Sequence, residues 1–267
     1  MRRPIRLIGV PTDSNSSFLR GAAQAPAQIR ASLASTHGNN AAENGLEIDA
    51  QIRLKDFGDI YIEETESDDA RIAEAVRLAV ADGDLPLALG GDHSITAPIV
   101  LTLAKIHGPL TIVHIDAHPD LYDQLDGNRR SHASPFARIL EAGAAKRLLQ
   151  VGVRTVNTHQ RQQASRFGVV QQIPARAFSV AAVPVLEGPL YVSIDLDGVD
   201  PSEAPGVSHH EPGGLTVREV LNVLDRQTAW VAGADVVELN PTRDVNGVTA
   251  VLAAKLVREI AAMKGAE

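Results

Sequence analysis

The chain contains no cysteine among its 267 residues, and aromatic residues make up only 3% of it. Without cysteine there can be no disulfide, no thiolate zinc site, no iron–sulfur cluster and no cysteine nucleophile. The lack of disulfides is typical of a reducing compartment, and the apolar stretch at 5–10 is too short for a signal-peptide core. We therefore expect a cytoplasmic protein, in which any metal ion would be held by nitrogen and oxygen atoms.

Long apolar runs and a surplus of basic residues are also missing. No run approaches the roughly 20 apolar residues that a membrane-spanning helix needs, so we expect no membrane partner. The chain has 33 acidic and 25 basic residues, which gives a net charge of −8 and argues against a nucleic-acid partner. Hydrophobic residues make up 44%, as in an ordinary globular protein with a sizeable core.

Short apolar runs alternate with helical patterns along the whole chain. The predicted strands cover 5–10, 52–57, 85–89, 110–115, 147–153, 169–173, 190–194 and 231–239. The predicted helices cover 26–33, 69–81, 95–106, 135–142, 159–166, 217–225 and 249–263. This alternation predicts an α/β fold with a parallel sheet between helices, although an eight-stranded α/β barrel fits the same pattern. No linker or repeat divides the chain, so we expect one domain over 1–267.

Four of the predicted strands end in residues that can carry chemistry. The motifs are Gly-Gly-Asp-His-Ser at 90–94, Asp-Ala-His-Pro-Asp at 116–120, Asp-Leu-Asp-Gly-Val-Asp at 195–200 and Glu-Leu-Asn-Pro at 238–241. Each motif alone could be a turn or a helix cap. Because ligands of open parallel sheets bind outside the carboxyl ends of the strands, we expect the four motifs to converge there. Carboxylates gathered at a buried edge are costly unless cations neutralise them.

Four aspartates in these motifs would balance two divalent cations, and two histidines would add neutral nitrogen ligands. These residues are Asp116, Asp120, Asp195, Asp197, His93 and His118. Oxygen and imidazole ligands without sulfur suit manganese, and also iron or cobalt. Two close divalent ions lower the pKa of a shared water towards about 7, so the pattern indicates a dinuclear hydrolase.

In order and spacing, these motifs resemble those of the ureohydrolase family, which comprises arginases, agmatinases and related amidino hydrolases. The similarity covers nearly the whole chain, and the stretches at 15–19, 131–134 and 253–259 resemble plant-type arginases in particular. The resemblance implies a single three-layer αβα domain with an eight-stranded parallel sheet, which decides against the barrel. It also implies two Mn²⁺ ions per subunit and a homotrimer or homohexamer.

The resemblance further implies a role for each site residue. One metal ion would be held by His93, Asp116, Asp120 and Asp195, and the other by His118, Asp116, Asp195 and Asp197. His132 matches a mobile histidine that shuttles protons, and Glu238 matches the glutamate that anchors the guanidinium group. Asp120 is expected to serve catalysis as well as metal binding. Asp92, Ser94 and Asp200 would orient the ligands.

The substrate tail is where the chain departs from animal arginases. Tyr122, Asn157 and Gln160 stand where those enzymes carry an asparagine and two acids that recognise the α-amino and α-carboxylate groups. We expect Asn157, Arg129 and Arg130 to contact the substrate, with the arginines favouring a carboxylate. The prediction is hydrolysis of L-arginine to ornithine and urea. The alternatives are agmatine or a guanidino acid other than arginine as substrate, an inactive metal-binding assembly subunit, or a deacylase on a related fold.

Overall fold

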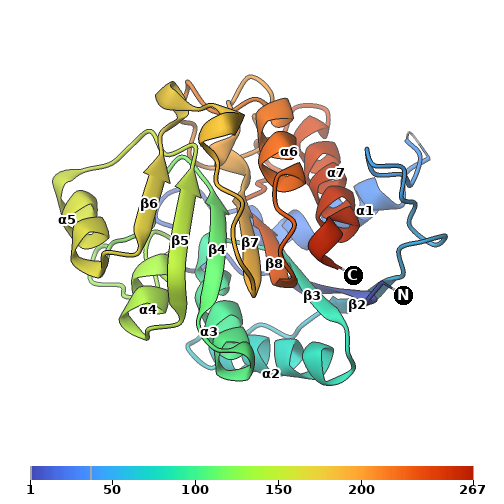
Figure 1. The fold of residues 1–267 in the computed structure, drawn as a ribbon, viewed down its shortest axis with the longest axis horizontal. Helices are drawn as coiled ribbons and strands as arrows, with labels where there is room; N and C mark the ends of the chain where they lie inside the picture. The colour runs from blue at the N-terminus through green and yellow to red at the C-terminus, as the bar shows by residue number, and fades with distance from the viewer. Residues whose placement is uncertain (1, 37, 267) are drawn as a thin grey trace.

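Eight parallel strands form one sheet in the computed structural model, which describes residues 2–36 and 38–266. The strands lie in the order β2-β1-β3-β8-β7-β4-β5-β6 (Figure 1). They are β1 (Ile5–Val10), β2 (Leu54–Asp59), β3 (Leu85–Gly90), β4 (Leu110–Ile115), β5 (Ala145–Val151), β6 (Val170–Ile173), β7 (Leu190–Asp195) and β8 (Val231–Val237). Every predicted strand is present, with its ends shifted by a few residues at most.

Helices cover both faces of this sheet. The helices are α1 (Ala25–Leu33), α2 (Asp68–Ala81), α3 (Thr96–His107), α4 (Pro135–Glu141), α5 (Thr158–Phe167), α6 (Val217–Asp225) and α7 (Val248–Ala262). Helices α1, α6 and α7 pack on one face, and α2 to α5 pack on the other. Successive strand side chains alternate between the two faces. Leu7 of β1 accordingly packs with the first group of helices and Ile8 with the second.

The sheet is open, which confirms the three-layer fold and makes the barrel alternative wrong. Within the described chain, β2 pairs with β1 alone and β6 with β5 alone, so both are edge strands. Most residues of β2 are exposed, whereas β3, β4, β7 and β8 are fully buried. Buried parallel strands need helices on both faces, and that accounts for their nearly continuous apolar sequences.

The four strands that carry the sequence motifs are the four central neighbours β3, β8, β7 and β4. Two glycines let their loops approach closely. A Cβ atom on Gly91 would lie 1.7 Å from the carbonyl oxygen of Thr12, and one on Gly198 would lie 2.8 Å from the backbone nitrogen of Asp116. Only glycine therefore fits at either position, and the ends of β3 and β7 come close to the neighbouring loops.

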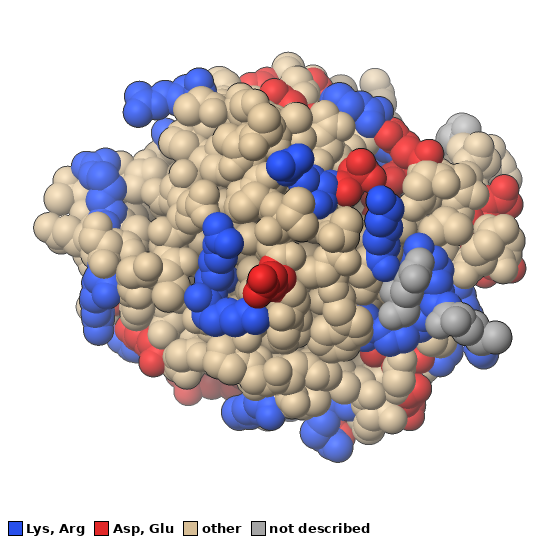
Figure 2. All heavy atoms as spheres, in the orientation of Figure 1, with Lys and Arg blue, Asp and Glu red and all other residues tan. Residues whose placement is uncertain are grey.

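Among the described residues, no helix is long and apolar enough to cross a membrane. On the face shown in Figure 2, acidic and basic side chains are interspersed and no continuous basic surface is seen.

Candidate metal centre

The carboxyl ends of the central strands bring the histidine and aspartate motifs together. His93 begins a short 3₁₀ helix after β3, and Asp92 caps that helix by accepting the Ser94 N–H at 3.0 Å. Asp116 follows β4 directly, and Asp195 is the last residue of β7. Adjacent parallel strands end at the same edge of the sheet, so the predicted convergence follows from the strand order.

Three carboxylates surround Nδ1 of His93. Asp120 Oδ2 lies 3.1 Å away, Asp195 Oδ2 3.2 Å away and Asp116 Oδ2 3.3 Å away. This nitrogen is buried, and it has no hydrogen-bond partner among the described residues. A buried polar atom without a partner is costly, whereas a cation between the nitrogen and the three oxygens would satisfy all four.

A second group forms around His118 on the other side of Asp116. Its Nδ1 lies 3.1 Å from Asp197 Oδ2 and 3.4 Å from Asp116 Oδ1. The ligand atoms of Asp116, His118 and Asp197 all lie within 4.8 Å of one another. Asp116 thus offers one oxygen to each group, as a residue shared by two neighbouring ions would do.

The electrostatics of the cluster show the need for added positive charge. No described lysine or arginine forms an ion pair with the site carboxylates. Burial and then the charges of Asp197 and Asp116 raise the pKa of Asp195 well above its usual value. Burial is also the main reason that the pKa of Asp197 rises to about 6. Divalent cations would reverse both effects, because a nearby positive charge favours the ionised carboxylate.

His114 also lies in this cluster, although it belongs to none of the four sequence motifs. Its Nε2 is 2.7 Å from Asp116 Oδ2, and its Nδ1 faces the Gln150 amide at 3.0 Å. The amide N–H can only donate, so Nδ1 accepts and Nε2–H donates to Asp116. Burial lowers the pKa of His114, which agrees with a neutral ring. Both ring nitrogens have hydrogen-bond partners, so His114 orients the Asp116 carboxylate and has no free nitrogen for a metal ion.

A buried network behind His93 is a second feature that sequence reasoning missed. Nε2 of His93 lies 2.9 Å from Ser193 Oγ, and this hydroxyl donates to Asp235 at 2.7 Å. Asp235 also accepts hydrogen bonds from Tyr191 at 2.6 Å and Thr96 at 2.7 Å. Such partners hold a ligating imidazole in one orientation. The available signal was a lone aspartate inside the apolar strand β8.

Glu238 lies at the end of β8, beside this cluster, with φ of 66°. Its Oε1 accepts the His93 backbone N–H and faces His132 Nδ1, both at 2.8 Å, while Oε2 is buried and has no hydrogen-bond partner in the described part of the chain. Burial raises the pKa of Glu238, but the charge and hydrogen bond of His132 outweigh it, so the pKa is lowered overall. A strained backbone at a buried acid is typical of a functional position.

His132 has partners for both of its protonation states. Burial lowers its pKa, but the charge and hydrogen bond of Glu238, together with the charges of Asp92 and Asp120, outweigh burial and raise the pKa to about 9. The backbone N–H of Ser17 points at Nε2 from 3.2 Å, a contact that requires an unprotonated nitrogen. The Ser17 hydroxyl lies 2.9 Å from the same atom and can accept a hydrogen bond from it when it is protonated. The pKa favours the charged ring and the Ser17 N–H favours the neutral ring, so the site accommodates either.

A cavity of about 210 Å³ opens onto these residues. Besides the acids and histidines, it is lined by Ser17, Tyr122, Leu125, Ala133, Thr155, Asn157 and Gln160. The Tyr122 hydroxyl accepts a hydrogen bond from Asn157 Nδ2 at 2.5 Å. His209, which no motif argument had assigned a role, also lines the cavity, 5.2 Å from His132 between ring centroids. Tyr122, Thr155, Asn157 and Gln160 are polar and uncharged, and no lysine or arginine of the described residues lines the cavity.

Arg129 and Arg130 do not line this cavity. Arg129 pairs with Glu141 at 2.8 Å and Arg130 pairs with Asp69 at 2.6 Å, so both guanidinium groups point to another surface. The structure does not bring them to the position that the substrate prediction requires. Asp200 also lies apart from the cluster, where it accepts the backbone N–H groups of Gly213 and Gly214 and holds that loop.

A cluster able to hold metal ions lies at the carboxyl edge of an open parallel sheet, which is where α/β proteins of this architecture bind their ligands. The sequence model of the Arginase family matches residues 3–263. Arginase 1, mitochondrial, from Arabidopsis thaliana is 50% identical over 96% of this chain and 80% of its own length. The agmatinase from Gallus gallus is 36% identical over 95% of this chain and 76% of its own length. The chain belongs to the arginase family and is a hydrolase.

The arginase from Medicago truncatula is a solved structure with the same fold. It has a TM-score of 0.93 and 44% identity, and the alignment covers 98% of this chain and 87% of that one. The similar plant arginases from Arabidopsis, rice and Medicago carry the word mitochondrial in their names, which contradicts the expected cytoplasmic location. The expectation failed because a lack of disulfides indicates a reducing environment without distinguishing one such compartment from another.

Proposed function

We propose that the protein hydrolyses L-arginine to ornithine and urea. The observation that carries this proposal is that Glu238 lines the cavity next to the histidine–aspartate cluster, while its buried Oε2 has no hydrogen-bond partner among the described residues. A guanidinium group presents paired N–H donors that suit such a carboxylate. An amide substrate of a deacylase has no comparable cation to place there. The relatives named arginase are also more similar to this chain than the relative named agmatinase.

Two Mn²⁺ ions are proposed for the cluster. His93, Asp120 and Asp195 would hold one ion, His118 and Asp197 would hold the other, and Asp116 would contact both. The donors are oxygen and imidazole nitrogen without sulfur, which suits manganese. When bound, the two ions would neutralise the carboxylates and activate water at neutral pH. By the family resemblance, Asp195 would be a ligand of both ions as well.

The chain's own residues would then orient the substrate and move protons. Glu238 would hold the guanidinium so that its carbon faces the metal cluster. Water adds its oxygen to that carbon and gives up two protons, the bond from the carbon to the chain nitrogen breaks, and the leaving nitrogen takes up two protons to depart as an ammonium group. His132 would pass protons from the water to this nitrogen, because its ring lies beside Glu238 and has partners in both protonation states.

The substrate tail would be recognised by neutral polar groups. Tyr122, Asn157 and Gln160 line the cavity, and Asn157 and Gln160 lie at the start of α5. Hydrogen bonds from such groups can bind the α-carboxylate and α-ammonium of arginine, and agmatine would lose the contacts to the carboxylate. Arg129 and Arg130 would not contact the substrate, because they pair with Glu141 and Asp69 outside the cavity. The expected homotrimer or homohexamer stays a prediction that light scattering can check.

The deciding experiment compares L-arginine, agmatine and 4-guanidinobutyrate on the manganese-loaded enzyme. We expect the highest kcat/KM for arginine, with urea as a product. A higher value for agmatine would replace the substrate and leave the metal chemistry in place, whereas no urea from any of them would favour the inactive assembly subunit. Glu238→Gln keeps the shape of the side chain and removes its charge, so it should lower kcat/KM by at least about tenfold.

A further inference from the structure

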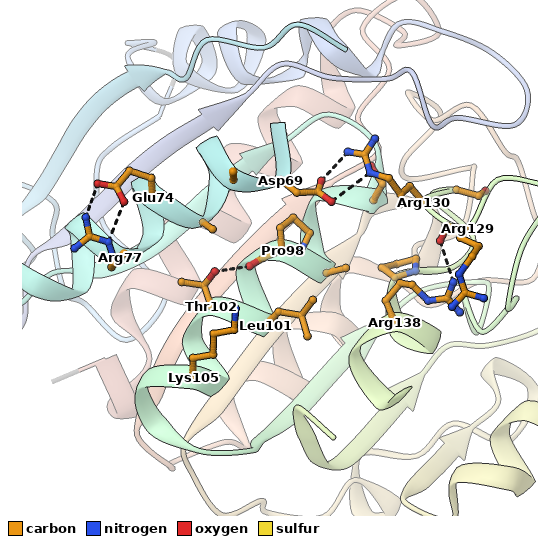
Figure 3. A pocket seen from close by; sticks show the side chains of 16 residues that line it. Asp69, Glu74, Arg77, Pro98, Leu101, Thr102, Lys105, Arg129, Arg130 and Arg138 are labelled. Atoms are coloured by element: carbon orange, nitrogen blue, oxygen red, sulfur yellow. Dashed lines mark hydrogen bonds and ion pairs between the residues drawn. The ribbon is translucent and has the colours of Figure 1, made fainter. Parts of the chain in front are cut away.

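A second cavity lies in the helical layer formed by α2, α3 and α4. Its volume is about 610 Å³, which is within the usual range of about 300–1,000 Å³ for small-molecule sites. It shares no lining residue with the cavity at the metal centre. We call it the α2–α3 groove, because side chains of these two helices form most of its walls (Figure 3).

The floor of the groove is apolar. Small side chains of α2, among them Ala73, line it together with Ala97, Pro98 and Leu101 of α3 and Pro135 of α4. Because alanine fills less space than a larger residue would, a hollow remains between the outer faces of the helices. Such a floor can bury the apolar or aromatic body of a ligand, which is favourable in proportion to the area removed from water.

Cationic side chains border this floor. They are Arg77, Lys105, Arg129, Arg130 and Arg138. Two of them are neutralised by acids on α2. Arg77 pairs with Glu74 at 2.5 Å and Arg130 pairs with Asp69 at 2.6 Å, as the dashed lines in Figure 3 show.

The other three cations have a single acid between them. Arg129 and Arg138 share Glu141, at 2.8 and 2.9 Å. Nε of Arg138 is buried and has no hydrogen-bond partner within 2–36 and 38–266, and Lys105 forms no ion pair with any residue of those ranges. Two positive charges therefore remain uncompensated at the groove, on a chain whose net charge is −8.

We infer that the α2–α3 groove binds a small organic anion that carries a carboxylate or phosphate group on an apolar or aromatic body. The body would lie on Leu101 and Pro98, and the anionic group would reach Lys105 or Arg138. An anionic group within hydrogen-bond reach of these cations would form charge-assisted hydrogen bonds, which are stronger than those between neutral groups. This site goes beyond the proposed function and does not rest on it.

The test uses the full chain loaded with manganese and 8-anilinonaphthalene-1-sulfonate as the probe, because this dye joins an aromatic body to an anionic group. We expect saturable fluorescence from one site per chain. Lys105→Glu should weaken binding at least tenfold, and Leu101→Asp should do the same if its thermal unfolding shows that it still folds. The matched control is Arg176→Glu, which makes the same charge change at an exposed residue outside the groove, and it should bind normally.

Displacement then identifies the anionic group. Benzoate and phenyl phosphate carry the same ring, so the better competitor shows whether a carboxylate or a phosphate is preferred. The inference is overturned if wild type shows no saturable binding, or if Lys105→Glu binds as well as wild type. It is also overturned if Arg176→Glu weakens dye binding as much as Lys105→Glu does, or if arginine displaces the dye. A change in the oligomer mass of Lys105→Glu by light scattering, without a change in dye binding, would overturn it as well.

Discussion

Both ends of the parallel sheet bury carboxylates, but the two ends differ in the source of the positive charge that neutralises them. At the amino end, the buried Asp84 accepts a hydrogen bond from Arg6 Nε at 3.0 Å and lies 2.7 Å from Lys55 Nζ. Arg6 also pairs with Asp82. At the carboxyl end, the aspartates after β4 and β7 have histidines beside them, and no described lysine or arginine pairs with them.

This difference separates a structural cluster from a functional one. Removing a carboxylate from water costs several kcal/mol, and the cost is offset only by a well-placed cation. The chain provides that cation at the amino end, so the cluster there is complete when the protein folds. At the carboxyl end the cation has to come from outside, and the same burial that makes the apo cluster costly makes it a strong site for divalent ions.

The largest effect should follow removal of the external cations. Chelation of the manganese-loaded protein should abolish urea release and lower the thermal unfolding temperature, because bound ions stabilise the folded state. Adding Mn²⁺ should restore both. Asp197→Ala should lose metal by elemental analysis, and Asp225→Ala, an exposed acid on α6, should keep it. Full activity of a metal-free sample would contradict the proposed mechanism.

The next effect concerns proton transfer at the carboxyl end. His132→Ala should keep both metal ions and lower kcat by about 10²- to 10⁴-fold, the usual contribution of a general acid or base. KM should change far less, since Glu238 still binds the guanidinium. His107→Ala, a change far from the cavity lining, is the control. An unchanged kcat in His132→Ala would remove His132 from the proposed reaction.

Breaking the amino-end cluster should reduce stability without touching the chemistry. Arg6→Met leaves Asp84 buried with Lys55 as its remaining cation, and we expect a loss of about 3 kcal/mol in the free energy of unfolding. Urea denaturation measures this loss. Arg77→Met, which breaks an exposed pair with Glu74, should cost less than about 1 kcal/mol. If Arg6→Met instead lowered the manganese content, the two ends would not be independent.

The smallest effect tests whether burial is the reason that the amino-end cluster contributes strongly to stability. Glu43 is exposed and pairs with Arg218 at 2.6 Å and Lys255 at 3.2 Å. The hydrogen bond from Arg218 is the main cause that lowers the pKa of Glu43 from 4.5 to about 2. Because the folded-state pKa is lowered, the stabilisation is present above 4.5 and is lost as the pH falls towards 2.

Glu43→Gln should therefore cost less than about 1 kcal/mol at neutral pH, since solvent screens this pair. The difference from wild type should shrink as the pH is lowered through that range. Urea denaturation of both proteins at several pH values measures it. A difference that grows on acidification would mean that the ion pair does not cause the pKa shift.

The elements of this fold could be predicted because their signals are local. The apolar run at 110–115 and the helical spacing at 249–263 depend on neighbours a few residues away. The first segment forms β4 and the second forms α7. The convergence of His93, Asp116 and Asp195 could also be predicted, because each follows a strand and parallel strands end at one edge. The pattern could not distinguish the open sheet from the barrel, since both alternate strand and helix.

Long-range packing settled the remaining features. The insertion of β8 between β3 and β7 brings Glu238 next to His93, which lies 145 positions away in the sequence. Arg129 and Arg130 are close to His132 in sequence, yet they turn to Glu141 and Asp69 on α4 and α2. Side-chain direction depends on which partners the folded chain brings within reach. The residue types and their spacing therefore determine the chemistry available to this protein, while the packed structure determines which groups face the cavity.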